Sequence, residues 1–246
     1  METTQTSFEQ RMTVQNPDLI QLYSIATANG IKAAACLEEL ISAIEEEGGS
    51  FDYEPHSIDI RHEEHKSAMF TDMNPNRKIP VIVDPHGENA HPVTVFESGA
   101  ILMYLAEKYK KLLPTDVHQR ADAITWLFWG SSSFSVQVKQ FGFYFKYCPH
   151  SLPYCVNRYR KSVQELLVAL NTQLSHTKPF IVGDMYTVAD IAIWPWIYAL
   201  HEFYDEAIEF HGLVEVPFVK EWYQRCIGRN ASKKSLEVCR FVFPDA

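Results

Sequence analysis

The hydrophobic pattern of the sequence changes once, near residue 113, and this change limits the folds that the chain can adopt. Up to that point, short apolar runs typical of strands are interspersed with helical spacing. After Leu113-Pro-Thr-Asp116 the strand-like runs stop, and only helical spacing follows. We therefore expect an α/β domain followed by an all-α domain, and 246 residues are enough for both.

Six elements are predicted before this boundary. In chain order they are a strand at 19–24, a helix at 29–40, strands at 51–60, 79–84 and 92–96, and a helix at 97–111. The first two strands need a helical crossover and should be parallel, whereas the last two are joined by a short turn and should be antiparallel. This mixed order is the thioredoxin-like topology, and we place the domain at 18–113. The polar residues 1–17 are predicted to be a flexible arm, or a strap without a fold of its own.

The second domain is expected to span 118–246 and to be entirely helical. The spacing predicts one long helix at 119–147, bent near 130–133, and further helices at 154–176, 188–204, 217–227 and 231–241. The helix at 188–204 begins with a capping-box sequence, Thr187-Val-Ala-Asp190. We assign a structural role to this cap and no catalytic one.

Charge and composition exclude several classes of function. The formal net charge is −9, and a strongly acidic chain repels phosphate backbones, so no nucleic-acid partner is expected. No apolar run approaches the length that crosses a bilayer, and the start of the chain lacks the apolar region of a signal peptide. The five cysteines, without a C-x-x-C pair, do not indicate a disulfide framework. These features favour a cytoplasmic protein with no membrane partner.

The most informative segment is Thr27-Ala-Asn29-Gly30, where the first strand ends and the first helix begins. Backbone amides and the helix dipole favour negative charge at such a junction, and a thiolate placed there is stabilised. The segment has no cysteine, so the thiol must come from a ligand, to which Thr27 and Asn29 can each donate a hydrogen bond. The alternative is a simple helix cap, for which Thr and Asn are common residues.

Two further segments can hold an extended peptide with an amino-acid head group. In Lys78-Ile79-Pro80, a cis bond before Pro80 would turn the Ile79 amide and carbonyl outward for strand addition; the alternative is an ordinary strand-initiating proline. In Glu97-Ser98, which follows the last strand, Ser98 can bind a carboxylate and Glu97 an amino group. A serine cap is the alternative there.

Together the three segments describe a site for a γ-glutamyl tripeptide, although each is weak alone. No metal is expected: His56, His62 and His65 have no cysteine partner, and the neighbouring carboxylates favour a solvated loop. The phosphate-binding loops G-x-x-x-x-G-K-[ST] and G-x-G-x-x-G are absent.

The sequence resembles nu-class glutathione transferases, which are related to the glutathione-transferase-like nitrogen regulator of yeast. The resemblance runs from about Asp18 to Arg229. The motifs that carry it are Thr27-Ala-Asn29-Gly30, Asn74-Pro-Asn-x-Lys78-Ile79-Pro80, Phe96-Glu97-Ser98-Gly99, Trp126-Leu-Phe-Trp129 and Tyr186-Thr-Val-Ala-Asp190-Ile-Ala-Ile-Trp194-Pro-Trp196. It implies the glutathione transferase architecture and a homodimer. It also implies a site that holds two reduced glutathione molecules, or one glutathione disulfide, as substrate or cosubstrate.

The resemblance also implies a set of site residues. Thr27 and Asn29 would contact the glutathione sulfurs, Lys78 and Ile79 the peptide, and Glu97 and Ser98 the γ-glutamyl end. Arg158 matches an arginine of the helical domain that helps to hold the glutathione carboxylates. His65-Lys66 and Lys146 depart from the family, which usually has Gln-Phe and often has His at these places. His65 is then either a carboxylate ligand or a solvated loop residue.

We expect a glutathione-dependent enzyme that reduces disulfides through a bound glutathione thiolate, which attacks the disulfide without a protein cysteine. Conjugation of glutathione to an electrophile is a second possibility, and a non-catalytic regulatory or binding module of the same fold is a third. Cys148 and Cys155 are either mixed-disulfide formers or small apolar fillers. Small-molecule disulfides or electrophiles are the expected partners.

Overall fold

The computed structural model describes residues 8–87, 91–177, 179–204 and 216–240, which divide into two compact units. The first unit contains the described residues up to Leu105 together with those from Ala231 on, and the second is Ala106–Asn230. The elements of the first unit are α1 (Phe8–Arg11), β1 (Ile20–Ser24), α2 (Ala28–Glu45), β2 (Tyr53–Ser57), η1 (Glu64–Lys66), α3 (Ala68–Met73), β3 (Val81–Asp84), β4 (Val93–Phe96), α4 (Ser98–Tyr109, which extends past the division) and α10 (Asn230–Glu237).

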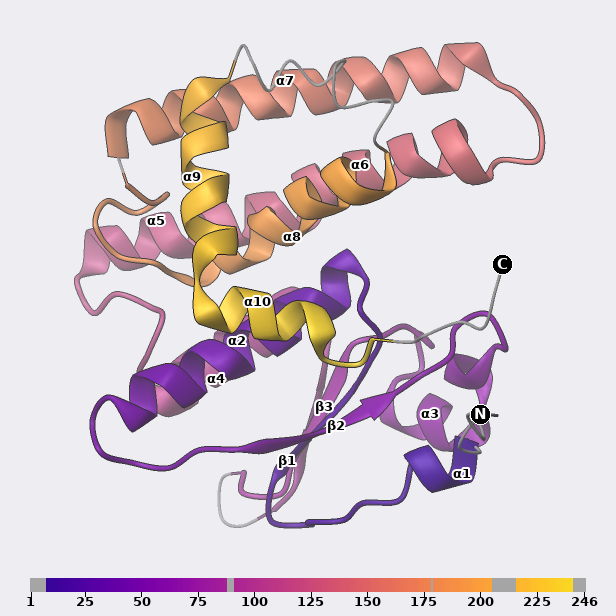
Figure 1. The fold of residues 1–246 in the computed structure, drawn as a ribbon, viewed down its shortest axis with the longest axis vertical. Helices are drawn as coiled ribbons and strands as arrows, with labels where there is room; N and C mark the ends of the chain where they lie inside the picture. Colours follow the sequence, from indigo (N-terminus) through magenta and orange to yellow (C-terminus); the bar gives the residue numbers. More distant parts are fainter. Residues whose placement is uncertain (1–7, 88–90, 178, 205–215, 241–246) are drawn as a thin grey trace, which may run out of the picture. The chain divides into compact units, whose positions relative to one another are not determined.

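The four strands of the first unit form one mixed sheet in the order β2-β1-β3-β4. β1 pairs in parallel with β2, with Leu22 opposite Pro55, whereas β3 runs antiparallel to both β1 and β4. The predicted directions of the strand pairs are therefore confirmed, and the unit has the thioredoxin-like topology. Figure 1 shows α2 and α4 on one side of the sheet and α3 on the other.

The core of this unit lies on both faces of the sheet. All five residues of β1 are buried, including the polar Gln21 and Ser24, because a strand covered on both faces loses the usual alternation of buried and exposed residues. Leu22 and Leu40 are fully buried, and burying each such side chain stabilises the fold by about 1.5–3 kcal/mol. A second cluster is formed by Met12, Tyr23, Ile58, Phe70 and Val81.

The described part of the N-terminal arm is attached to β2, where we expected a segment without a fold of its own. Phe8–Arg11 forms α1, and Met12 is buried. The Glu54 carboxylate accepts the amides of Gln15 at 2.7 Å and Asn16 at 2.8 Å. The arm therefore adds hydrogen bonds and apolar contacts to the first unit.

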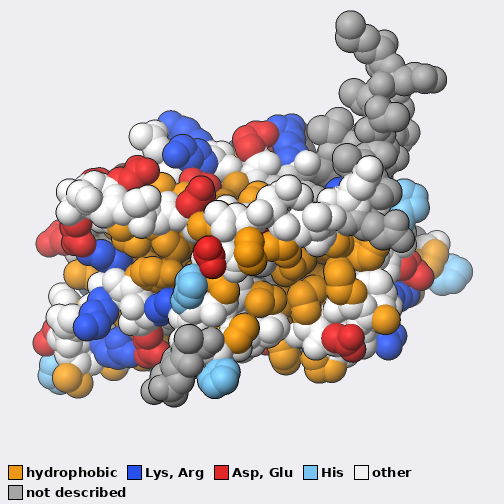
Figure 2. Space-filling model, turned by 90° about the horizontal axis from the view of Figure 1, so that it is seen from below, with side chains coloured by type: hydrophobic (Ala, Val, Ile, Leu, Met, Phe, Trp, Pro, Cys, Tyr) orange, Lys and Arg blue, Asp and Glu red, His pale blue; other side chains and the backbone are white. Residues whose placement is uncertain are grey.

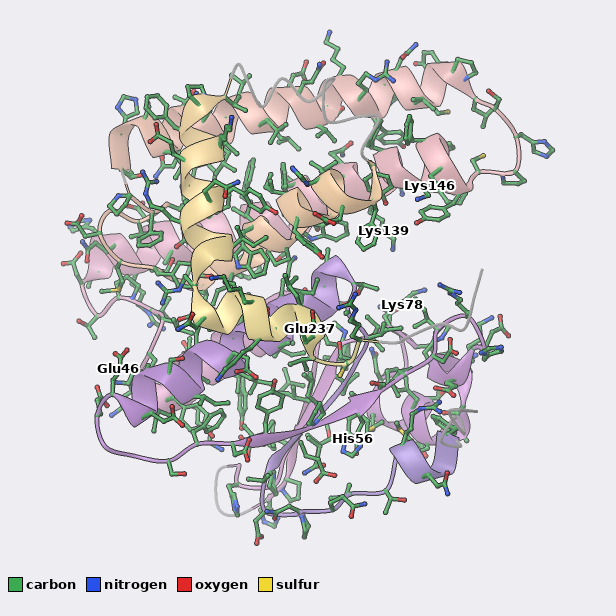
Figure 3. All side chains as sticks on the ribbon, in the orientation of Figure 1. Glu46, His56, Lys78, Lys139, Lys146 and Glu237 are labelled. Atoms are coloured by element: carbon green, nitrogen blue, oxygen red, sulfur yellow. The ribbon has the colours of Figure 1, made fainter. Side chains whose placement is uncertain are left out.

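The buried His56 of β2, labelled in Figure 3, connects this arm to the sheet. Its Nδ1 lies 2.8 Å from the Arg11 carbonyl oxygen, and its Nε2 lies 2.7 Å from Gln21 Oε1. The ring also stacks on Tyr23, with 4.6 Å between the ring centroids. His56 thus has a structural role, and within the described residues no group of three or more His, Cys, Asp and Glu side chains could hold a metal ion.

The chain returns to the first unit near its C-terminal end, whereas our sequence-based division kept 118–246 together. In Figure 1, α10 lies beside α2, and Lys234 Nζ is 3.9 Å from Glu38 Oε2. The Ala26 amide donates a hydrogen bond to the Cys239 carbonyl oxygen at 3.2 Å. This bond ties the C-terminal segment to the loop that leads into α2.

The second unit is helical. Its elements are α5 (Val117–Phe128), η3 (Trp129–Phe134), α6 (Ser135–Gly142), η4 (Phe143–Tyr147), α7 (Pro153–Thr177), α8 (Val188–Phe203) and α9 (Pro217–Gly228). The stretch predicted as one helix at 119–147 is divided by two π-helical turns, η3 and η4. Gly130 lies in the first of these, and a Cβ atom there would be only 2.7 Å from Ile193 Cγ1, so α8 packs closely against this turn.

The predicted capping box at the start of α8 is confirmed. The Thr187 side chain accepts the Ala189 amide at 3.2 Å, and the Asp190 carboxylate accepts the Thr187 amide at 2.9 Å. Asp190 is fully buried and also accepts the Trp222 indole N–H at 2.7 Å. Burial raises the pKa of Asp190 to about 6, although these hydrogen bonds oppose the shift.

Within the described ranges, no helix combines the length and the apolar character that a membrane span requires. Figure 2 shows one face of the molecule, on which hydrophobic side chains are exposed between acidic and basic ones.

Candidate functional site

Thr27 caps the N-terminus of α2 and keeps a hydrogen-bond donor available. Its Oγ1 accepts the Gly30 amide at 3.3 Å, and the residue has extended backbone angles, as N-cap residues do. Because a hydroxyl has one donor and two acceptor positions, the O–H group can still donate to a ligand. The cap and a ligand contact are therefore compatible at this residue.

Gly30 allows the tight junction between β1 and α2. A Cβ atom at this position would lie 1.9 Å from the Ile25 carbonyl oxygen and 2.6 Å from Ser24 Oγ. Any larger residue would displace the backbone just before Thr27. Gly30 therefore fixes the direction in which α2 leaves the sheet.

Asn29 and Ser98 bring two predicted segments into contact. Ser98 is buried at the start of α4, and its Oγ donates to Asn29 Oδ1 at 3.4 Å. The bond uses the acceptor atom of the Asn29 amide and leaves the Nδ2 group able to donate to a ligand. The structure thus places the beginnings of α2 and α4 side by side.

Glu97 precedes α4 in an unusual backbone conformation. Its φ angle is 70°, in the left-handed region that few non-glycine residues adopt, and its side chain is exposed. The negative charge of Glu97 partly offsets the lowering of the Lys32 pKa that burial causes; Lys32 is a fully buried residue of α2. Sequence reasoning missed Lys32; the available signal was a lysine within the otherwise apolar segment Ile31–Leu37.

The loop before β3 presents Lys78 and Ile79. Lys78 is exposed (Figure 3), and its carbonyl oxygen accepts a 2.7 Å hydrogen bond from the buried Asn74 side chain. The Ile79–Pro80 bond is cis, which the sequence had left open. Neither the amide nor the carbonyl of Ile79 hydrogen-bonds to another described residue, so both are available to an extended peptide.

His65 lies in η1 and is half-buried. Its Nδ1 atom is buried and has no hydrogen-bond partner among the described residues. Burial lowers the pKa of the imidazole, and the positive charges of Lys78 and then Lys66 lower it further. The positive charge of Lys78 and the imidazole of His65 are together suited to binding a ligand carboxylate.

Arg158 is the only residue of the predicted set that belongs to the helical unit, where it is exposed on α7. The other seven all belong to the first unit.

A thioredoxin-like unit followed by a helical unit, with polar side chains at the first helix and at the last strand–helix junction, defines the glutathione transferase class of fold.

Two family models match the chain. The N-terminal domain of glutathione S-transferases matches residues 34–107, and the C-terminal domain matches residues 153–225. The disulfide-bond oxidoreductase YghU of Escherichia coli is 39% identical over 223 residues, which cover 90% of this chain and 75% of the relative. The chain belongs to the glutathione S-transferase family.

Solved structures give the same result. A glutathione transferase family member from Pseudomonas fluorescens, with two glutathione molecules bound, matches with a TM-score of 0.86 and 36% identity over 94% of this chain and 98% of that one. A glutathione transferase from Pseudomonas putida, with one glutathione disulfide per subunit, matches with a TM-score of 0.84 and 30% identity over 94% and 96% of the two chains.

Proposed function

We propose that the protein reduces small disulfides with glutathione, and that the reactive thiolate belongs to the bound tripeptide. The observation that carries this proposal is the N-terminus of α2, which presents Thr27 and Asn29 but no cysteine. The relative named a disulfide-bond oxidoreductase and the structural neighbours that bind glutathione or its disulfide support it.

The first step is attack of the glutathione thiolate on a disulfide R–S–S–R. A glutathione sulfur–substrate sulfur bond forms, and the substrate sulfur–sulfur bond breaks, which releases one thiolate R–S⁻. Thr27 and Asn29 would hold the thiolate by hydrogen bonds, and the α2 dipole favours its negative charge. A second glutathione thiolate then attacks the mixed disulfide, which yields glutathione disulfide and the second R–S⁻.

The rest of the tripeptide would be held by the remaining predicted residues. Ile79 offers its amide and carbonyl to the peptide backbone, in the manner of strand addition. Glu97 and Ser98 would receive the amino and carboxylate groups of the γ-glutamyl end, and Lys78 and His65 another carboxylate. Arg158, from the helical unit, is proposed to contact a glutathione carboxylate as well.

The class and the assembly are also part of the proposal. We assign the protein to the nu class and propose a cytoplasmic homodimer. Exposed large hydrophobic side chains of the helical unit, such as Phe128, Phe143 and Tyr147, support self-association, because exposed apolar side chains are common at protein interfaces.

Two of the buried cysteines, Cys36 and Cys239, are poorly suited to catalysis. All five are free thiols; Cys36, Cys226 and Cys239 are buried, and Cys148 and Cys155 are half-buried. Burial raises the pKa of Cys239 to about 12 and raises that of Cys36 as well, so neither forms a thiolate readily.

The test is a variant without cysteines. Alanine replaces the three buried cysteines, which avoids burying a hydroxyl group, and serine replaces Cys148 and Cys155. We expect this variant to reduce hydroxyethyl disulfide with glutathione at a rate close to that of the wild type. Loss of activity in a variant that is folded by circular dichroism would refute the ligand-thiol mechanism.

Two other outcomes would redirect the proposal. Turnover of chlorodinitrobenzene far above disulfide turnover would favour conjugation of glutathione to electrophiles. Calorimetry that detects no binding of glutathione or glutathione disulfide would favour a non-catalytic module of the same fold.

A further inference from the structure

The N-terminal arm contains a charged contact to which the proposed reaction assigns no role. Arg11, the last residue of α1, forms an ion pair with Glu64, the first residue of η1, although the two are 53 positions apart in the chain. The two side chains are only 14% and 13% exposed. Such a covered pair differs from a surface ion pair, because removal of one partner leaves the other charge uncompensated in a poorly hydrated place.

Arg11 is itself attached to the first unit by several contacts. Its backbone carbonyl oxygen lies 2.8 Å from Nδ1 of the buried His56, and its Nε donates to the Ser57 carbonyl oxygen at 3.3 Å. The next residue, Met12, belongs to the second apolar cluster of the unit, and Phe8 packs against the same cluster. The arm therefore presents the Arg11 guanidinium group from a fixed position.

Glu64 connects Arg11 to the loop that leads into η1. Its Oε1 binds the Arg11 guanidinium group, and its Oε2 accepts the Asp59 amide at 2.6 Å. The Glu64 amide in turn donates to the Asp59 carbonyl oxygen at 3.1 Å. One carboxylate therefore closes the loop before η1 and fastens it to the arm.

The η1 turn has few other side-chain supports. Glu63, the residue before it, has a φ of 59° in the left-handed region and forms no side-chain cap. Such a conformation persists where the surroundings hold it in place. The ion pair between Glu63 and Lys66 is exposed on both sides, so its contribution should be small. The contact between Arg11 and Glu64 is therefore well suited to hold the turn.

His65 lies between Glu64 and Lys66 in this turn. Its buried Nδ1 has no hydrogen-bond partner among the described residues, so no bond at this nitrogen orients the ring. The position of the imidazole then depends on the backbone of η1. A displacement of Glu64 should therefore displace His65 as well.

We propose that Arg11 is a positioning residue: through its ion pair with Glu64 it holds η1 in the place from which His65 binds the glycine carboxylate of glutathione. This inference rests on the proposed function, in which the carboxylate outside the γ-glutamyl end is held by His65 and Lys78. It gives the N-terminal arm a role in ligand binding without a direct contact between Arg11 and the ligand.

The first experiment compares two ligands by calorimetry: glutathione, and glutathione with its glycine carboxylate replaced by a carboxamide. We expect the wild type to prefer glutathione by about tenfold or more, as for a charge-assisted contact. Arg11→Met should lose most of this preference, whereas Arg11→Lys, which keeps the charge, should retain more of it. The control Arg120→Met, which removes the partner of Glu107 in the helical unit, should keep the full preference.

A combination of Arg11→Met with His65→Ala tests whether Arg11 acts through His65. If it does, the double variant should lose no more of the preference than His65→Ala alone. An unchanged preference in Arg11→Met, or losses that add in free energy in the double variant, would overturn the proposal. An equal loss of affinity for both ligands would also overturn it, because it would indicate a general structural role.

The second experiment is hydrogen exchange in the free protein, which does not depend on glutathione. The amides of Glu64 and Ser67 donate hydrogen bonds at the two ends of η1, and the Asn74 amide donates one at the end of α3. Arg11→Met should speed exchange at Glu64 and Ser67 by about tenfold or more and leave Asn74 nearly unchanged. Equal changes at all three amides, or none, would refute the support of η1 by Arg11.

The two experiments separate this inference from the proposed function. If the wild type binds neither ligand, the proposed function and the ligand role of Arg11 both fail. If it binds glutathione but Arg11→Met keeps the wild-type preference, the proposed function stands and the positioning role fails.

Discussion

Ser98 Oγ donates a hydrogen bond to Asn29 Oδ1 across 3.4 Å, although the two residues are 69 positions apart in the chain. The bond joins the first turn of α4 to the first turn of α2. Two segments that the sequence singled out for different parts of a tripeptide are therefore one structural unit. A substitution at either residue should therefore alter the contribution of the other to ligand binding.

A double-mutant cycle on these two residues should show coupling. We expect Asn29→Ala and Ser98→Ala each to weaken glutathione binding, and the double variant to lose less than the sum, because the second change removes a bond that is already broken. The coupling free energy should be about 0.5–1.5 kcal/mol, that of one hydrogen bond. Dissociation constants from calorimetry give this value, and strict additivity would contradict it.

Thr27→Ala should reduce activity by more than its loss of a helix cap explains. Ser67 provides a matched control, because it caps α3 and accepts the Phe70 amide at the same 3.3 Å distance. Each variant should lose about 0.5–2 kcal/mol of stability in urea unfolding. Only Thr27→Ala should lose about tenfold or more in kcat/KM for hydroxyethyl disulfide, as expected when a donor to the thiolate is removed. Equal kcat/KM losses in both variants would mean that Thr27 is only a cap.

The pKa of His65 should respond to Lys78 and to ligand. Lys78 contributes to lowering this pKa, so Lys78→Met should raise it in the free protein, as measured by NMR titration. A ligand carboxylate favours the imidazolium form, so saturation with S-methylglutathione, which has no titrating thiol, should also raise it. By linkage, affinity for this ligand should then increase as pH falls from about 8 to about 6. A His65 titration that ignores the ligand would indicate a solvated loop residue.

Asp190→Asn should strongly destabilise the helical unit. Each carboxylate oxygen accepts two donors: Oδ1 the Ile181 amide and the Trp222 indole, and Oδ2 the Thr187 amide and hydroxyl. An asparagine must turn its NH₂ group toward one of these donor pairs, at an expected cost of about 3–5 kcal/mol in urea unfolding.

The control for this prediction is Asp184→Asn, at an exposed position a few residues earlier, which should change stability by less than about 0.5 kcal/mol. A small effect at Asp190 would mean that this network contributes little.

The main elements of the fold were predictable because their patterns are long. The short, mostly apolar run of β1, the helical spacing of α7 and the capping box of α8 can each be recognised from a short stretch of sequence. The six-residue helix α3 was missed within the long connection before β3, because so short a segment shows no period.

Other features follow only from tertiary contacts. Lys32 is a good helix former and lysine is usually exposed, so the apolar residues around it were the only local sign that it is buried. The division of the helix at 117–147 by two π-helical turns has no simple pattern, although Gly130 marks the place where α8 approaches. The candidate site residues were chosen one by one from three junctions, and the contact between Asn29 and Ser98 could not be read from their spacing.

The return of the chain to the first unit makes the helical unit, in terms of connectivity, an insertion between two parts of one domain. A fragment ending at Leu113 would lack α10 and the Cys239 carbonyl that holds the Ala26 amide, one residue before Thr27. Removing the tail by proteolysis, or attaching a bulky tag to it, should therefore disturb the entrance of the first helix. The N-terminal half is best regarded as an incomplete folding unit.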